Sequence, residues 1–197
     1  MIPQDRTCRA GALDNPIRRW LAPARREVDR LGLAPGMVVA DLGTGVGYFL
    51  PELAERVGPE GVVIAADVDE ENLERARARP HPPCSLRFLQ RSAADLPEVP
   101  DGSVDRVLLS LVICCLADKE GAMDEAWRVL RPGGKALVTY PRALGFGDRP
   151  GTLRVSRRRW RTLQLRRPWR ALPVAAGIVV RRHLLEKPPT VAGGPQA

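Results

Sequence analysis

The stretch DLGTGVGY, from Asp41 to Tyr48, decides how this sequence folds. It follows the short run MVVA, whose β-branched and small apolar residues are typical of a buried strand. Gly43, Gly45 and Gly47 alternate with other residues, and Asp41 stands two positions before the first of them. Glycines are placed where a backbone turns tightly or approaches a ligand closely. A strand that runs through such a loop into a helix predicts a ligand site at the carboxyl end of that strand.

Strands and helices alternate along the rest of the chain. We expect helices over residues 15–31, 46–57, 69–79, 119–130 and 151–167, and strands over residues 37–42, 62–67, 85–90, 104–112, 135–140 and 177–185. Strands that are apolar on both faces are typical of a parallel sheet covered on both sides. The sequence therefore predicts an α/β fold, with a doubly wound, mostly parallel sheet of six or seven strands and helices on both faces. Little sequence follows residue 185, so a seventh strand would be very short.

The 197 residues, of which 44% are hydrophobic, suit a single domain with a real core. We expect residues 1–35 to form a helical segment that caps the site, residues 36–185 to form the main domain, and residues 186–197 to form a disordered tail. Each apolar run is shorter than the ~20 residues that span a bilayer, and the start MIPQDRTCRAG lacks a signal-peptide core. A cytoplasmic protein without a transmembrane segment is expected.

The four cysteines indicate neither a metal site nor a disulfide framework. Cys8, Cys84, Cys114 and Cys115 show no C-x-x-C spacing, and the last two are chain neighbours that pair poorly with each other. Free thiols and no bound metal are therefore expected. A soft metalloid could bind the adjacent pair, but packing in the core is the favoured interpretation.

Positive charge is concentrated near the end of the chain. Residues 151–197 hold ten arginines and one lysine against the single acid Glu186, whereas residues 1–150 hold 20 basic and 22 acidic residues, which gives the net charge of +8. Arg154, Arg157, Arg158 and Arg161 follow helical spacing and would make one basic face. A local anionic partner is indicated rather than a generally basic protein.

The spacing of the glycines and a later motif identify the kind of site. A G-x-G-x-x-G dinucleotide fingerprint from Gly43 would need glycine at position 48, where Tyr48 stands. Asp67 ends the second strand, where its carboxylate can accept both hydroxyls of a ribose, as in nicotinamide-binding proteins. The segment DEAWRVLRPGGKALVTY, residues 124–140, is more specific. With the glycine loop it resembles the class I S-adenosylmethionine-dependent methyltransferases, particularly small bacterial single-domain members, over roughly residues 13–141.

The resemblance implies S-adenosylmethionine as cofactor and assigns its contacts residue by residue. The implied cofactor-binding residues are Asp41, Gly43, Gly45, Gly47, Asp67, Val68, Ser92, Ala93, Ser110 and Leu111. The glycines would let the backbone approach the methionine part, and Asp41 would hold the loop or reach the cofactor ammonium through water. Asp67 would bind the ribose, and Val68 would cover one adenine face.

Two assignments depart from the family pattern or have a packing explanation. Ser92 and Ala93 stand where the family commonly has Asp-Ala beside the adenine amino group, so the serine hydroxyl would be a weak replacement. Ser110 and Leu111 would line the sulfonium side. Apolar residues at strand ends are usually packing, which applies to Val68 and to Leu111.

Methyl transfer from an activated donor needs orientation more than a catalytic group, so the catalytic residues stay unknown. A general base is required only when the acceptor arrives protonated with a high pKa. Tyr140, at the end of the fifth strand, is the best polar candidate, although a hydrogen-bonded tyrosine at the rim is the commoner outcome. His81 and His183 are better explained as surface or structural residues. Cys114 and Cys115 stand where relatives often carry a pair of histidines, which argues against a base there.

Three functional classes compete. The favoured one is an enzyme that methylates a small molecule, with the arginine face attracting an anionic acceptor such as a carboxylate or phosphate. The second is a nucleic-acid methyltransferase, which is disfavoured because only 5% of the residues are aromatic and no RNA-binding appendage is present. The third is a non-catalytic cofactor-binding module that acts through a partner. The acceptor and the oligomeric state cannot be read from the sequence.

Overall fold

The computed structural model describes residues 23–141, 155–175, 177 and 180–190. Its elements are α3 (Ala24–Leu31), β1 (Val38–Leu42), α4 (Leu50–Val57), β2 (Val62–Asp67), α5 (Glu70–Arg77), β3 (Ser85–Gln90), β4 (Val104–Ser110), α6 (Lys119–Val129), β5 (Leu130–Pro141), α7 (Arg157–Gln164), β6 (Arg170–Leu172) and β7 (Val180–Glu186). The alternation expected from the sequence is confirmed. Residues 1–22 of the expected capping segment and 191–197 of the expected tail lie outside the described residues, so those boundaries stay predictions.

The strands form one seven-stranded sheet in the order β3-β2-β1-β4-β5-β7-β6. Strands β1 to β5 pair in parallel, and β7 runs antiparallel to both β5 and β6. The predicted doubly wound, mostly parallel sheet is therefore confirmed. The very short strand is present, but it comes before the last long strand in the sequence and not after it. This strand, β6, covers residues 170–172 and pairs with the outer edge of β7.

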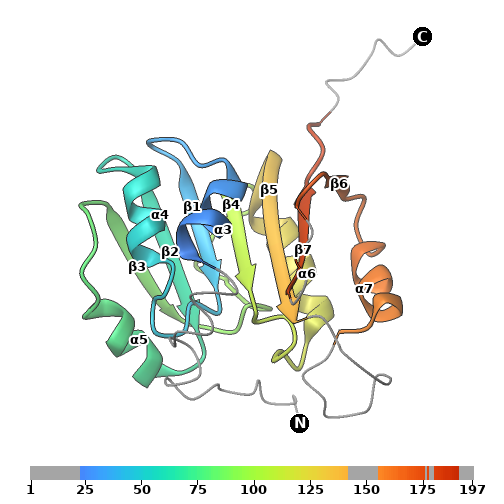
Figure 1. Cartoon of the computed structure of the whole chain (residues 1–197), viewed down its shortest axis with the longest axis horizontal. Coiled ribbons are helices and arrows are strands. Elements are labelled where there is room, and N and C mark those ends of the chain that lie inside the picture. Colours follow the sequence, from blue (N-terminus) through green and yellow to red (C-terminus); the bar gives the residue numbers. More distant parts are fainter. Residues whose placement is uncertain (1–22, 142–154, 176, 178–179, 191–197) are drawn as a thin grey trace.

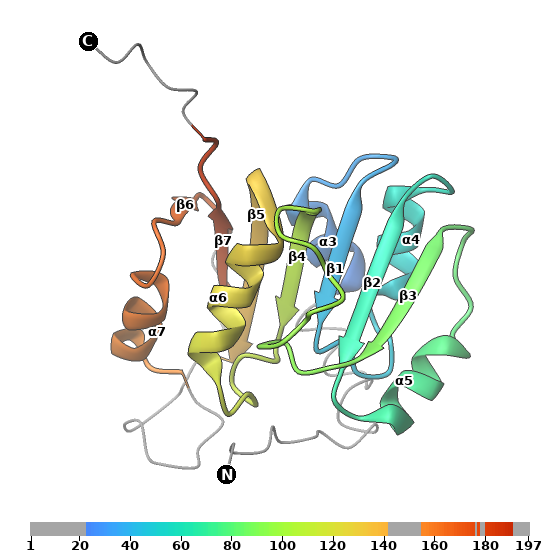
Figure 2. The same ribbon diagram turned by 180° about the vertical axis from the view of Figure 1, so that it is seen from behind.

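Helices cover both faces of the sheet. Figure 1 shows α3 and α4 in front of the sheet, and Figure 2 shows α6 and α7 on the opposite face. Alternate residues of one strand enter different cores, because successive side chains of a strand point to opposite faces. Val39 of β1 belongs to the core cluster that holds residues of α3 and α4, whereas Ala40 belongs to the cluster that holds residues of α6 and α7. Both cores are apolar, as the two-sided strand pattern predicts.

Two elements near the glycine loop are shorter than expected, for backbone reasons. Helix α4 begins at Leu50 and not at residue 46, because Gly43, Gly45 and Gly47 have φ of 77°, 55° and 74° and keep the preceding residues in turns. Strand β4 ends at Ser110 and not at residue 112, because Leu111 has φ of 59°. A non-glycine residue in this left-handed region is uncommon and often marks a functional site.

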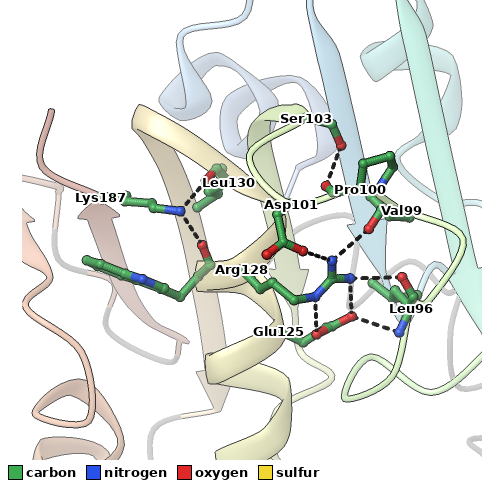
Figure 3. Close-up of polar contacts among 10 residues, drawn as sticks. Leu96, Val99, Pro100, Asp101, Ser103, Glu125, Arg128, Leu130 and Lys187 are labelled. Carbon is green, nitrogen blue, oxygen red and sulfur yellow. Dashed lines mark hydrogen bonds and ion pairs between the residues drawn. The ribbon is translucent and has the colours of Figure 1, made fainter. Parts of the chain in front are cut away.

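The edge of the sheet away from the glycine loop is held by a polar cluster around Arg128 (Figure 3). Its guanidinium donates to Glu125, to Asp101 and to the carbonyls of Leu96 and Val99. The hydrogen bond with Glu125 is the largest cause that raises the pKa of Arg128. This cluster fixes the segment before β4 to the last turn of α6, so it serves the fold at the edge that carries no ligand loop.

Among the described residues, no helix is both long and apolar enough to cross a bilayer.

Candidate functional site

The glycine loop leaves the carboxyl end of β1 and turns back across β2. The amides of Gly43 and Thr44 both donate to the carbonyl of Ala66, at 2.8 and 3.0 Å. Gly43 is required by packing as well as by its φ, since a Cβ built there would lie 2.2 Å from Cγ2 of Val112. At Gly47 a Cβ would lie 2.8 Å from Cδ1 of Leu50. Two of the three glycines therefore let protein segments approach one another, in addition to any ligand.

Asp41, at the start of the glycine loop, stabilises the loop through a hydrogen bond with Thr44. It is 1% exposed, and its Oδ2 accepts a hydrogen bond of 2.8 Å from the Thr44 hydroxyl. Of its two predicted roles, the contact within the loop is present in the structure. Thr44 was not among the predicted residues, although a hydroxyl three positions after a buried acid is the signal that could have identified it.

Asp67 links the end of β2 to the middle of the glycine loop. Its Oδ2 accepts the Gly45 amide at 2.8 Å, and its Oδ1 accepts the Asp69 amide at 3.0 Å. Burial raises the pKa of Asp67, and hydrogen bonds from Asp69, Gly45 and Asn72 oppose that shift. The two carboxylate oxygens offer about four acceptor sites, and these three hydrogen bonds leave one of them for a hydroxyl donor such as that of a ribose.

A second link to the loop was missed by the sequence reasoning. The guanidinium Nε of Arg79, beyond the end of α5, donates to the Val46 carbonyl at 3.1 Å. An arginine 33 positions away in sequence gives no local signal of this contact. Val68, which directly follows Asp67, is half-buried.

The other predicted contacts lie at the carboxyl ends of β3 and β4. Ser92 is half-buried, and its hydroxyl accepts the amide of Ala94 at 3.3 Å, while Ala93 is buried. Ser110 is buried, and its hydroxyl lies 3.1 Å from that of Thr139 on β5. The structure thus brings the ends of β1 to β4 to one edge of the sheet (Figure 1).

Thr139 was not predicted, and it fixes the unusual backbone of Leu111. The Leu111 amide donates to both the carbonyl and the Oγ1 of Thr139, at 3.0 and 3.1 Å. These bonds, made by a residue that is fully buried, hold Leu111 in its left-handed conformation. The side chain of Leu111 stays half-buried at the edge of the site.

Tyr140, the candidate catalytic residue, is buried within an aromatic cluster. Only 1% of its surface is exposed, and its hydroxyl lies 3.1 Å from Nε2 of His183. Trp160 of α7 stacks on the His183 ring with 4.1 Å between the centroids. Burial raises the pKa of Tyr140 to about 12 and lowers the pKa of His183 to about 4. Both groups are uncharged at neutral pH, which fits the expected hydrogen-bonded tyrosine and a structural His183.

The remaining candidates lie elsewhere. His81 is half-buried, and its Nδ1 contacts the carbonyl of its neighbour Pro82 at 2.8 Å. Cys114 is buried, and Cys115 is half-buried. In the part of the chain that the structure describes, no group of three or more His, Cys, Asp or Glu side chains is arranged to hold a metal ion.

Helix α7 carries part of the expected basic face. Arg157, Arg158 and Arg161 are exposed, whereas Trp160 and Leu163 turn into the core as expected. Arg154, the fourth member of the face, lies outside the described residues.

Comparisons with known proteins agree with this geometry. The family described as a methyltransferase domain matches residues 40–138, half of the chain. A Pasteurella multocida ubiquinone/menaquinone biosynthesis C-methyltransferase is 34% identical over 58% of this chain and 43% of its own length. An arsenite methyltransferase from Halobacterium salinarum is 35% identical over 54% of this chain and 28% of its own length. The chain thus matches less than half the length of these relatives.

A solved structure matches a larger share of the chain. The crystal structure of an S-adenosylmethionine-dependent methyltransferase from Aquifex aeolicus has a TM-score of 0.75, covers 90% of this chain and 96% of its own, and is 24% identical. That likeness establishes the fold, and the family match covers the glycine loop, Asp67 and the turn before the main part of β5. The chain therefore belongs to the class I S-adenosylmethionine-dependent methyltransferase family.

Proposed function

We propose that this protein transfers a methyl group from S-adenosylmethionine to a small-molecule acceptor by in-line displacement. The observation that carries the proposal is the link between Gly45 and Asp67, in which a carboxylate at the end of β2 holds the loop at the end of β1. This arrangement fixes a hydroxyl-binding acid beside a backbone turn. It supports the predicted contacts of the cofactor, in which Asp67 binds the ribose and the glycine loop lies along the methionine part.

Methyl transfer from S-adenosylmethionine requires few catalytic side chains. S-adenosylmethionine supplies an activated methyl group, so positioning of the two reactants can provide ~7–11 kcal/mol of the barrier reduction. Asp67 and the glycine loop would orient the donor, and Leu111, held by Thr139, would border the space where the acceptor enters. Tyr140 and His183 are uncharged and bonded to each other, so an acceptor whose reacting atom is already unprotonated suits this site best.

A small acceptor with an anionic group is favoured over a nucleic acid. Four of the C-terminal arginines form ion pairs within the protein: Arg159 pairs with Glu120, Arg166 and Arg167 share Asp124, and Arg170 pairs with Glu186. On α7 this leaves Arg157, Arg158 and Arg161 without an ion pair to any described residue. Three such charges suit a carboxylate or phosphate better than a long polyanion track. The names of the two relatives above, one of quinone biosynthesis and one of arsenite, also point to small acceptors.

The test is a transfer assay with labelled S-adenosylmethionine on two substrate panels. One panel holds small acids, phenols, amines and thiols, and the other holds mixed RNA. A labelled small product formed by the parent but not by Asp67→Ala would support the proposal. Label transferred only to RNA would overturn it in favour of the nucleic-acid class. Tight cofactor binding with no transfer to either panel would favour the non-catalytic class.

A salt titration checks the basic face separately. If Arg154, Arg157, Arg158 and Arg161 bound RNA, log affinity would fall with log salt by about 0.7 per phosphate neutralised on a single strand. Changing all four to Gln would then reduce the slope by roughly three. We expect weak RNA binding in the parent and in the variant, with no change of slope.

A further inference from the structure

The two adjacent cysteines form a compact pair of sulfurs. Cys114 and Cys115 follow β4 in a turn in which the Cys115 amide donates to the Val112 carbonyl at 2.7 Å. Their Sγ atoms lie 3.9 Å apart. Both sulfurs approach the Leu111 carbonyl, at 3.3 Å from Cys114 and 4.0 Å from Cys115. Adjacent side chains often point apart, but here the turn directs both toward one carbonyl.

This turn packs on the glycine loop. Val112, two residues before Cys114, occupies the space beside Gly43, since a Cβ on that glycine would meet Val112 Cγ2 at 2.2 Å. Leu111, in its left-handed conformation, starts the turn. The sulfur pair therefore belongs to the segment that borders the candidate site. Cys115 is half-buried and gives one side of the pair access to solvent, while Cys114 is 6% exposed.

The geometry suits a single bridging atom better than a disulfide. Consecutive Cα atoms across a trans peptide are ~3.8 Å apart, whereas disulfide-linked residues usually have Cα atoms ~4.4–6.8 Å apart. Two bonds of ~2.3 Å from one atom to two thiolate sulfurs, at angles of about 100–110°, place the sulfurs roughly 3.5–3.8 Å apart. The observed 3.9 Å needs only a small adjustment to reach that spacing.

The number of protein ligands indicates which kind of atom the two sulfurs can bind. A structural zinc ion needs four ligands, and among the described residues no third Cys, His, Asp or Glu joins the pair. A trivalent arsenical with one organic substituent needs only two sulfurs, because its substituent occupies the third bond. We propose that Cys114 and Cys115 form a bidentate binding site for such trivalent arsenicals. The proposal goes beyond the proposed function and holds whether or not arsenic is methylated.

The binding step is a ligand exchange without a redox change. With methylarsonous acid, CH3As(OH)2, two As–S bonds form and two As–O bonds break. The two thiol protons leave with the two hydroxyl groups as water. Arsenic stays trivalent, and no oxidant or reductant is needed.

The experiment measures adduct formation by intact-protein mass spectrometry under native conditions. Methylarsonous acid should add one methylarsenic group, with loss of two hydrogens, to the parent and to a variant in which Cys8 and Cys84 are both Ala. In that background, Cys114→Ala and Cys115→Ala should each weaken binding by about 100-fold or more, because chelation by two linked groups gains ~10²–10⁴ over one. Equal binding by either single-thiol variant would overturn the proposal.

Thermal unfolding separates a preformed site from reaction with an unfolded chain. A ligand of the native state raises stability by RT ln(1 + [L]/Kd), whereas a ligand that binds the unfolded chain preferentially lowers it. We expect methylarsonous acid to raise the Tm of the Cys8/Cys84 double variant and to leave the Tm of its Cys115→Ala derivative unchanged. A lowered Tm of the double variant would show that the pair binds only when the turn opens, and would overturn the proposal. Neither the adduct mass nor the Tm depends on methyl transfer. Failure of the arsenical-binding proposal is therefore distinguishable from failure of the proposed function.

Discussion

The carboxylate of Glu27 on α3 and the guanidinium of Arg182 on β7 form a buried ion pair across 155 positions of sequence. Nε of Arg182 lies 2.8 and 3.1 Å from the two carboxylate oxygens, and its second nitrogen lies 2.7 Å from Oε1. The side chains are 0% and 8% exposed. The pair ties the first described helix to β7, which runs antiparallel to β5, so it fixes α3 over the β5 side of the sheet.

Glu27→Gln should destabilise the protein by about 3–5 kcal/mol, because it leaves a buried guanidinium without its countercharge. The measurement is the free energy of unfolding in urea. The matched control is Asp29→Asn on the same helix, which breaks the exposed pair between Asp29 and Arg56 and should cost no more than about 1 kcal/mol. Equal costs for the two variants would contradict the importance of the buried pair.

Gly43→Ala should lower both stability and cofactor affinity. Alanine at φ of 77° costs about 1–2 kcal/mol, and its Cβ would also meet Val112. Gly36→Ala is the control, because its φ is 79° but no atom lies within 4 Å of the added Cβ. We expect Gly36→Ala to show only the backbone cost and to bind S-adenosylhomocysteine as the parent does. If the two variants lose affinity equally, the packing of Val112 on the loop is not what shapes the site.

Asp67→Ala should weaken binding of S-adenosylmethionine and S-adenosylhomocysteine by about 1.5–3 kcal/mol, since a charged acceptor is lost. It also frees the Gly45 amide, which adds a loss of loop order. Titration calorimetry gives the affinity, and circular dichroism checks the fold. Glu71→Gln, on the exposed side of the nearby α5, is the control and should bind normally. In the parent, the cofactor at ~100 times its Kd should add about 2.7 kcal/mol of stability, while NAD should add none.

Stability should fall as pH falls from about 6.5 to about 4. The pKa of His183 is lowered to about 4 in the folded protein, so in this window the unfolded chain binds a proton that the folded chain does not. Each pH unit then removes up to about 1.4 kcal/mol. His183→Gln should remove this part of the slope, while His81, which lies elsewhere, stays in both proteins. A parent and variant with parallel pH profiles would show that His183 titrates normally.

The sequence by itself determined the alternation of strands and helices and the place of the ligand loop. The run VVIAA in β2 is apolar on both faces, which indicates a parallel sheet, and a loop with glycines at three alternate positions permits the left-handed turns found there. These are local properties: side-chain periodicity and allowed φ values act over a few residues. For the same reason Trp160 and Leu163 could be predicted to face the core.

Only the tertiary structure decided which distant groups support the loop. Thr139, Arg79 and Val112 contact the site from other elements, and no local pattern marks them. The order of the last two strands depended on the pairing of β6 with β7 at the edge of the sheet. Strand β6 has only three residues, and such a short segment carries no sequence pattern that predicts a strand. The spacing of the Cys114 and Cys115 sulfurs depended on the left-handed turn at Leu111. That turn is imposed by hydrogen bonds to β5, and so it exists only once the sheet has formed.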